Sequence, residues 1–586
     1  SLRTDEFVLQ SCALAGFFYE EALRTDPAVA QELSRTLEAH FVRTVERSVQ
    51  QKPFSFTCAR LLEVAISRGA MADSCTSPVV TIMHRVFVSG LQHGHFDSRS
   101  LGRPNCNVTE QALALVGSWL AQSNSIESVL VAHIAYNVSV SPLIQSLSSV
   151  TTLKRLDLDA CYLSAELLVG YLSNSSVAAH LESLRYYRVA SVMNDELHNV
   201  GEALWSLKQL RELELADVDN DLLESSALFA PGAFGGSLKR LVLQGSGPYA
   251  SFRALERIFA ACPHLESLSV ASCDWSAEKR SPLEALGACN NTLRELHWLQ
   301  GVELPGSDSI GSLCAHVAPS SVRCLELSNA SSLSSEQWQC ILRSPSHLTD
   351  LTVTYPGNSF DDAVLVALGE AAGKTLTRLS LLQCNNTTIA GWNSLLQHCS
   401  ALEELSFGGL SVVDEKLIES LTSSASASTL RILDLRGCRR INPSCSFAYL
   451  QRCSRLCSLD VSCITLGGTV SAELLAALPW LEILRLDATE DEFHRMIEMC
   501  DPERTRWREV SVSGAAITDR TIALLATRLG AWLEHLRTNE TTACTIAALP
   551  SLRQMVALRS LPDLLLPRAA MHWLAFTMPS LRFVRS

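Results

Sequence analysis

A glycine-containing segment has the residue types of a phosphate-binding loop. Gly369, Gly373, Lys374 and Thr375 occur in the order that such a loop uses. A P-loop has four residues between its glycines, so that the backbone amides surround the phosphates, and here there are three. The segment also follows a predicted helix instead of a strand. We therefore expect a glycine that ends a helix before a strand beginning at Leu376.

Other patterns that could support catalysis or metal binding are sparse. His93 and His95 are two residues apart and could bind a metal ion in a loop, although an exposed turn is the simpler expectation. The sequence contains no H-E-x-x-H, paired C-x-x-C or G-x-S-x-G, so the minimal spacings of zinc proteases, zinc fingers and serine hydrolases are missing. The carboxylates are spread too evenly to single out a general acid and base. We expect no enzyme activity, no metal and no cofactor.

Charged residues that recur at a regular interval are the candidate binding site. Nine of the ten are acidic: Asp157, Arg185, Glu212, Glu214, Glu295, Glu326, Asp350, Glu404, Asp434 and Asp460. Any exposed strand face carries charge for solubility. If the carboxylates share one face, however, they would steer a basic partner to it, such as a Lys- or Arg-rich tail or a ribosomal-type protein.

The sign of the charge changes toward the C-terminus. Six arginines lie close together in the sequence there: Arg504, Arg506, Arg508, Arg520, Arg528 and Arg537. They could contact an acidic partner or nucleic acid. The formal net charge of the chain is -13, which argues against nucleic acid bound along its whole length, because phosphate binding needs clustered Lys and Arg.

A repeated frame, L-x-x-L-x-L, positions these residues. Its first apolar residue, which we call the anchor, recurs every 23 to 29 residues, a period typical of a repeat architecture. The anchors are Ile126, Leu153, Leu181, Leu210, Leu238, Leu265, Leu293, Val322, Leu348, Leu376, Leu402, Leu430, Leu456, Leu481, Trp507, Leu533, Leu558 and Leu581.

Each frame predicts one strand followed by one helix. In a strand from Leu156 to Leu158 the two leucines point inward and Asp157 points outward. In the segment from Ser334 to Leu342, Ser334 and Gln337 have the spacing of a capping box at the start of a helix. Stacked units of this kind form a parallel sheet on the concave side and helices on the convex side.

Several repeats resemble a known family. Cys262–Cys273, Leu430–Cys438 and Ile517–Asp519 are similar to the cysteine-containing leucine-rich repeats of F-box receptor proteins, and Phe360–Leu381 resembles the ribonuclease-inhibitor subtype. The resemblance covers about four fifths of the chain. It implies an α/β horseshoe solenoid of about eighteen repeats, and it implies a protein-binding scaffold without specifying the pathway.

The cysteines follow the same frame. Cys161, Cys273, Cys384 and Cys438 each lie eight residues after an anchor, and Cys262, Cys399 and Cys453 lie three residues before one. A small buried side chain suits these positions. We expect packed, reduced thiols and neither metal ligands nor nucleophiles.

The first 115 residues lack the frame and have helical periodicity. Helices are expected near Phe56–Ile66 and Pro78–Leu91, and Pro27 after Asp26 marks a helix start. We expect an α-helical cap over residues 1–115 and the solenoid over 116–586. An F-box would lie in this segment, but its Leu-Pro opening is missing.

Together these features predict a non-catalytic scaffold or adaptor subunit of a larger assembly, possible settings being a ribonucleoprotein or an organellar complex. The alternative is the substrate receptor of an SCF-type ubiquitin ligase with a degenerate F-box, which residues 1–60 would reveal by binding a Skp1-like adaptor. No apolar run in the sequence is long enough to span a membrane. We expect an intracellular protein, in the cytoplasm or the mitochondrial matrix.

Overall fold

The computed structural model describes the strands and helices of most repeats. The described residues are 95–97, 110–122, 126–132, 134, 138–159, 161, 163–187, 194–216, 236–244, 261–271, 292–299, 321–331, 333–345, 347–464, 473, 475, 478, 480–538, 543–562, 578 and 582–584. The helices expected before residue 95, the F-box segment, His93 and Cys273 lie outside them. The chain divides into two compact units, Ser1–Trp275 and Ser276–Ser586.

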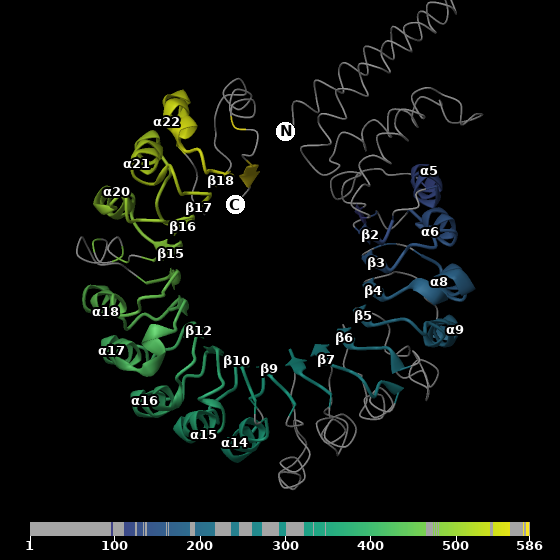
Figure 1. The fold of residues 1–586 in the computed structure, drawn as a ribbon, viewed down its shortest axis with the longest axis horizontal. Helices are drawn as coiled ribbons and strands as arrows, with labels where there is room; N and C mark the ends of the chain where they lie inside the picture. The colour runs from purple at the N-terminus through teal and green to yellow at the C-terminus, as the bar shows by residue number, and fades with distance from the viewer. Residues whose placement is uncertain are drawn as a thin grey trace, which may run out of the picture. The chain divides into compact units, whose positions relative to one another are not determined.

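Unit 1 contains parallel strands that pair in sequence order. Its described strands are β1 (His95–Asp97), β2 (Ser128–Ala132), β3 (Arg155–Asp159), β4 (Ser183–Tyr187), β5 (Glu212–Ala216), β6 (Arg240–Gln244) and β7 (Ser267–Ala271). Its described helices are α5 (Glu110–Ala121), α6 (Ser141–Leu147), α7 (Ala165–Leu172), α8 (Ser175–His180) and α9 (Asn194–Trp205). Figure 1 shows these helices on one side of the strands.

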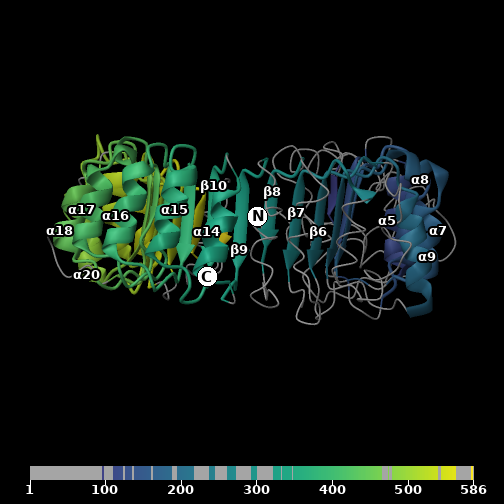
Figure 2. The ribbon, with the colours of Figure 1, turned by 90° about the horizontal axis from the view of Figure 1, so that it is seen from below.

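Unit 2 repeats the same arrangement. Its strands are β8 (Glu295–Trp298), β9 (Cys324–Ser328), β10 (Asp350–Thr354), β11 (Arg378–Leu382), β12 (Glu404–Ser406), β13 (Ile432–Asp434), β14 (Ser458–Val461), β15 (Ile483–Asp487), β16 (Glu509–Ser513), β17 (His535–Thr538), β18 (Ser560–Pro562) and β19 (Arg582–Val584). Its described α-helices are α14 (Ser335–Arg343), α15 (Asp362–Ala372), α16 (Ile389–His398), α17 (Glu415–Ser423), α18 (Pro443–Leu450), α20 (Glu490–Met499), α21 (Asp519–Leu529) and α22 (Leu549–Gln554), and two short 3-10 helices are η4 (Ala425–Ser428) and η5 (Ile546–Ala548). Figure 2 shows α14 to α17 side by side.

The strands are in register, as the repeated frame predicts. Leu156 of β3 pairs with Leu184 of β4, and Leu351 of β10 pairs with Leu379 of β11. From β2 to β18, each strand begins two residues after its anchor, from Ile126 onward. Equivalent side chains of neighbouring repeats therefore form continuous rows across the sheet, about 4.8 Å apart.

The core consists of the inward rows and the apolar faces of the helices. Leu379 and Leu381 are at most 2% exposed, and the helix residues Trp338 and Trp392 are fully buried. Trp338 packs edge-on against Phe360 of the next repeat, with ring centroids 5.1 Å apart. Burying a side chain of this size stabilises the fold by about 1.5–3 kcal/mol, so each repeat depends on its neighbours for the burial that it cannot provide alone.

The predicted helix boundaries are confirmed where the structure describes them. Ser334 and Gln337 form both hydrogen bonds of a capping box at the start of α14. Gly373 is the C-cap of α15, as expected, and its N–H donates to the carbonyl of Gly369. Turns after the strands place Asn329, Tyr355 and several glycines at positive φ, where the chain leaves the sheet.

Three details differ from the sequence expectation. β1 is a strand within the segment expected to be a helical cap, and it pairs with β2. His95 therefore lies on a strand instead of a turn, with its Nδ1 atom 3.0 Å from Oγ of Ser128. Cys340 is disulfide-bonded, so the expectation of reduced thiols is wrong at this position.

Candidate functional site

The candidate site is the concave face, by which we mean the face of the sheet opposite the helices. The first, third and fifth residues of each five-residue strand point to this face, because strand side chains alternate. All ten candidate residues occupy such positions on their strands. Their side-chain contacts differ, and these contacts determine which of the ten residues a partner could bind.

Asp157 differs from the prediction of an exposed carboxylate. Its side chain is 8% exposed, because the guanidinium of Arg155 on the same strand covers it, with Nε 3.1 Å from Oδ2. The alternation of the strand is as predicted, but the neighbouring arginine removes this carboxylate from solvent. Asp157 is thus a poor contact for a partner.

The other candidates in unit 1 are also partnered. Arg185 forms an ion pair with Glu214 of the next strand, with Nε and Oε1 3.1 Å apart. Ser183 donates a hydrogen bond of 3.2 Å to Glu212. On the concave face of β3 to β6, four carboxylates face three arginines, so this stretch is almost neutral.

In unit 2 the balance is strongly acidic. The concave positions of the seven strands from β8 to β14 carry six carboxylates and one arginine, Arg378. We call these six residues the acidic arc: Glu295, Glu326, Asp350, Glu404, Asp434 and Asp460. At about 4.8 Å per strand the acidic arc extends over about 29 Å.

Two pairs on the acidic arc bridge neighbouring strands. His297 Nδ1 lies 2.8 Å from Oε2 of Glu326. Arg378 forms an ion pair with Asp350, whose side chain is 15% exposed, and Thr349 donates a hydrogen bond of 2.6 Å to the same carboxylate. These contacts leave Asp350 less accessible than its strand position alone would suggest.

Asp434 and Asp460 also form hydrogen bonds with the backbone of the turns that follow their strands. Each accepts a hydrogen bond of 2.9 Å from the backbone N–H two residues ahead, in Arg436 and Ser462. Asp434 in addition accepts a 2.8 Å hydrogen bond from the hydroxyl of Ser406. Such local bonds hold the turn that follows the strand, so both aspartates have a structural role beside any role in binding.

Glu295 and Glu404 are the most available carboxylates of the acidic arc. Among the described residues neither forms an ion pair, and neither is buried. They lie four strands apart, on β8 and β12, which corresponds to about 19 Å. A partner can reach both without displacing an arginine.

The structure adds basic residues that the sequence interpretation missed. Arg378 and Arg485 occupy concave positions and pair with Asp350 and, at 4.0 Å, with Asp460. Arg485 also lies 3.4 Å from Glu509. The sequence could have identified both arginines. They occupy the third and fifth positions of the frames anchored at Leu376 and Leu481, which the interpretation did not include.

The C-terminal arginines do not form one patch. Arg520 and Arg528 lie on helix α21, Arg537 lies on the concave face, and the other three precede β16. Four of the six have carboxylate partners: Arg504 pairs with Asp501, Arg508 with Glu482, Arg520 with Glu498 and Arg537 with Glu509.

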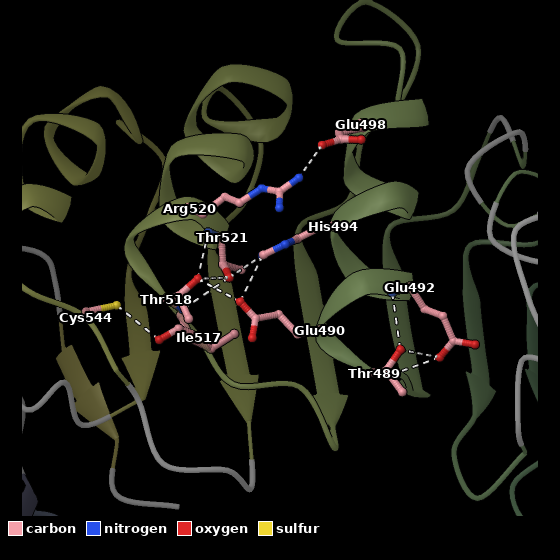
Figure 3. Close-up of polar contacts among 10 residues, drawn as sticks. All are labelled: Thr489, Glu490, Glu492, His494, Glu498, Ile517, Thr518, Arg520, Thr521 and Cys544. Carbon is pink, nitrogen blue, oxygen red and sulfur yellow. Dashed lines mark hydrogen bonds and ion pairs between the residues drawn. The ribbon is translucent and has the colours of Figure 1, made fainter.

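A polar cluster between α20 and α21 resembles a nucleophile and base, but it is closed to solvent. His494 Nε2 lies 2.8 Å from Oγ1 of Thr521, and Thr518 donates a 3.1 Å hydrogen bond to Glu490 (Figure 3). Thr521 is fully buried and His494 is 2% exposed. A substrate cannot reach this hydroxyl, so we interpret the cluster as a link between two repeats.

The six frame cysteines that the structure describes are buried thiols, as expected. Cys161 and Cys438 are fully buried, and burial raises the pKa of each thiol to about 12. At neutral pH such thiols are protonated and poor nucleophiles or ligands. Within the part of the chain that the structure describes, no cluster of three His, Cys, Asp or Glu could hold a metal ion. No helix among the described residues has the length and apolar character needed to cross a membrane.

Comparison with known proteins adds structural likeness only. No protein-family model matches the sequence, and no curated protein shows significant sequence similarity to it. Among solved structures, the yeast Rad7–Elc1 complex is similar at 17% identity over 69% of this chain and 88% of that chain, with a TM-score of 0.40.

Two further structures are similar at the same level. An internalin from Listeria monocytogenes matches at 15% identity over 64% of this chain and 88% of that chain, with a TM-score of 0.31. The TLR13–ssRNA13 complex matches at 15% identity over 75% of this chain and 61% of that chain, with a TM-score of 0.36. Likeness at this level says nothing about what the present chain binds. The chain's own in-register parallel strands, each begun by the repeated apolar frame and backed by helices, show that it is a leucine-rich-repeat solenoid.

Proposed function

We propose that this protein is a non-catalytic scaffold that binds a basic segment of a protein partner on the acidic arc. The observation that carries this proposal is the charge of β8 to β14, where six concave carboxylates face one arginine. A surface of one sign raises the association rate of an oppositely charged partner and disfavours partners of the same sign.

The geometry suggests an extended segment laid across the strands. Because the acidic arc extends over about 29 Å, it accommodates about nine residues of extended chain. Glu295 and Glu404 would form the main contacts, since the other four carboxylates already have partners. Lys or Arg side chains about six residues apart on the segment would reach both glutamates.

This role fits a subunit that joins proteins within a larger assembly. A ribonucleoprotein or organellar complex is one setting, because such assemblies contain proteins with Lys- and Arg-rich tails. In the same scheme the segment before β1 forms a helical cap, and the solenoid begins with β1, which pairs with β2.

The test is binding of a defined basic peptide to the full chain. The probe is a fluorescein-labelled nine-residue peptide of alternating Arg and Ser, followed by fluorescence anisotropy at low and moderate salt. We expect the double variant Glu295→Lys/Glu404→Lys to weaken binding about tenfold or more, because two attractive contacts become repulsive. Asp434 and Asp460 are left intact, since their reversal would also disturb turns.

The matched control reverses two exposed glutamates on the helices. Glu370→Lys/Glu419→Lys makes the same change in net charge on α15 and α17. Affinity close to that of the wild type is expected for this control. Equal weakening by both double variants would mean that only net charge matters, and it would refute a site on the acidic arc.

A further inference from the structure

The residue just before the anchor links two repeats in part of the solenoid. In five repeats it is a Ser or Thr whose hydroxyl donates a hydrogen bond to the carbonyl of the preceding anchor: Thr152 to Ile126, Ser237 to Leu210, Ser321 to Leu293, Thr375 to Leu348 and Thr429 to Leu402, at 2.6 to 2.8 Å. This small, internally bonded side chain leaves little for a partner to contact.

Four consecutive repeats of unit 2 have large side chains at this position. The same position holds Arg455, Trp480, Arg506 and Trp532, which we call the Arg–Trp row. The side chains of Trp480 and Trp532 are among the large apolar groups left exposed, at 54% and 36%. Exposing two indole rings costs solvation free energy, which suggests that a partner covers them.

The four residues form a line along the N-terminal ends of four neighbouring strands. They precede the parallel strands β14, β15, β16 and β17, which pair in register. Neighbouring members are therefore about 4.8 Å apart along the edge, and the two tryptophans about 9.6 Å. The guanidinium carbon of Arg506 lies 5.4 Å from the ring centroid of Trp532, a cation–π distance.

The arginines of the row are available for an anion. Arg455 and Arg506 are exposed and form no ion pair with any described residue, whereas the adjacent Arg504 and Arg508 pair with Asp501 and Glu482. Two unpaired guanidinium groups thus alternate with two exposed indole rings. Trp and Arg are also the residue types that most often dominate the binding energy of protein interfaces.

We propose that the Arg–Trp row binds an extended, acidic, proline-containing segment of a partner protein. A polyproline II helix advances about 3.1 Å per residue, so residues three apart lie about 9.3 Å apart on one face. This matches the separation of about 9.6 Å between alternate repeats. Glu at every third position can pair with Arg455 and Arg506, while prolines between them pack on Trp480 and Trp532.

A single-stranded nucleic acid fits this row less well. Stacked bases are about 3.4 Å apart, whereas neighbouring members of the row are about 4.8 Å apart. Successive bases therefore cannot each align with one member of the row. A single strand also carries one phosphate charge per nucleotide, which is more than the two unpaired arginines of the row can pair with. The protein segment is therefore the occupant that the observations favour.

The test uses the full chain and a fluorescein-labelled peptide of four Glu-Ala-Pro repeats, with binding followed by anisotropy. We expect saturable binding that Trp480→Ala/Trp532→Ala weakens at least tenfold. Arg455→Glu/Arg506→Glu should weaken it as much. All four side chains are exposed, so circular dichroism and the melting temperature should stay unchanged.

Two controls distinguish binding at this site from nonspecific binding of the peptide. Trp205→Ala removes another exposed tryptophan with a cation over its ring, Lys208 at 4.1 Å, and should leave affinity unchanged. The variant Glu295→Lys/Glu404→Lys should also bind the acidic peptide normally, which distinguishes the row from the acidic arc.

Three outcomes would overturn the proposal. The first is failure of the wild-type chain to bind the Glu-Ala-Pro peptide. The second is equal binding of a Lys-Ala-Pro peptide. The third is tighter binding of a twelve-residue oligothymidylate that is lost in the tryptophan double variant, which would assign the row to nucleic acid.

Discussion

At the scale of single residues, His494 shows how a buried titratable group makes stability depend on pH. Burial lowers the pKa of its imidazole from the usual 6.5, and the positive charge of Arg520 acts in the same direction. The carboxylates of Glu490, Glu498 and Asp491 oppose this shift but do not cancel it. The neutral imidazole is therefore the form that the fold accommodates.

The pH dependence follows from the direction of that shift. As pH falls below about 6.5, the unfolded chain binds a proton that buried His494 does not, so stability is lost between 6.5 and the lowered pKa. We expect amide exchange in α20 and α21, corrected for intrinsic rates, to be faster at pH 5.5 than at pH 7.5. His494→Gln should reduce that difference, and an unchanged difference would contradict the assignment.

At the scale of elements, a carboxylate at the start of one helix holds the cap of the next. Asp362 of α15 accepts hydrogen bonds of 2.7 and 2.5 Å from the backbone N–H and hydroxyl of Thr388, the N-cap of α16. Asp519 and Thr545 form the same arrangement later in unit 2. This clamp aligns successive helices, and it was not foreseen because the two partners are 26 residues apart.

Gly391 makes the clamp possible. A Cβ atom on this residue would collide with the carboxylate of Asp362. Gly391→Ala should therefore displace the carboxylate and destabilise unit 2 by about 1–3 kcal/mol, the cost of leaving its hydrogen bonds unmade. Chemical denaturation followed by circular dichroism measures the change.

Gly170 provides the control for that variant. It lies in α7, with open space where a Cβ would be placed, so Gly170→Ala should be neutral or stabilising by up to about 1 kcal/mol through helix propensity. If the two variants changed stability equally, steric displacement of Asp362 would not be the cause.

At the scale of the whole molecule, each repeat obtains its stability from adjacent repeats. Leu379 is 2% exposed and belongs to the inward row shared by β10, β11 and β12. Leu379→Ala should cost about 2–5 kcal/mol. Because contacts are local, hydrogen exchange should accelerate most in β10 to β12 and least in β17.

The neighbouring Ser380 tests this view. It is partly exposed on the concave face of the same strand, so Ser380→Ala should leave exchange almost unchanged. Uniform acceleration along unit 2 after Leu379→Ala would indicate that the unit unfolds as a whole and not by repeats.

The sequence by itself determined the repeat, the strands and the identity of the core. Anchors such as Leu376 and the inward pair Leu379 and Leu381 could be predicted, because the pleat of a strand alternates side chains with a strict period of two. The capping box of Ser334 was also predictable, since its two residues are neighbours in the chain. These features depend on local backbone geometry.

Only the tertiary structure decided which charges are available. Asp350 and Glu404 have equivalent positions in their frames, yet Arg378 of the neighbouring strand pairs with Asp350 alone. The exposure of Trp480 likewise depends on the neighbouring repeats. The physical reason is that pairing and exposure depend on side chains of the neighbouring repeats, about 25 residues away in the sequence. A local sequence pattern does not specify which of these side chains come into contact across the sheet.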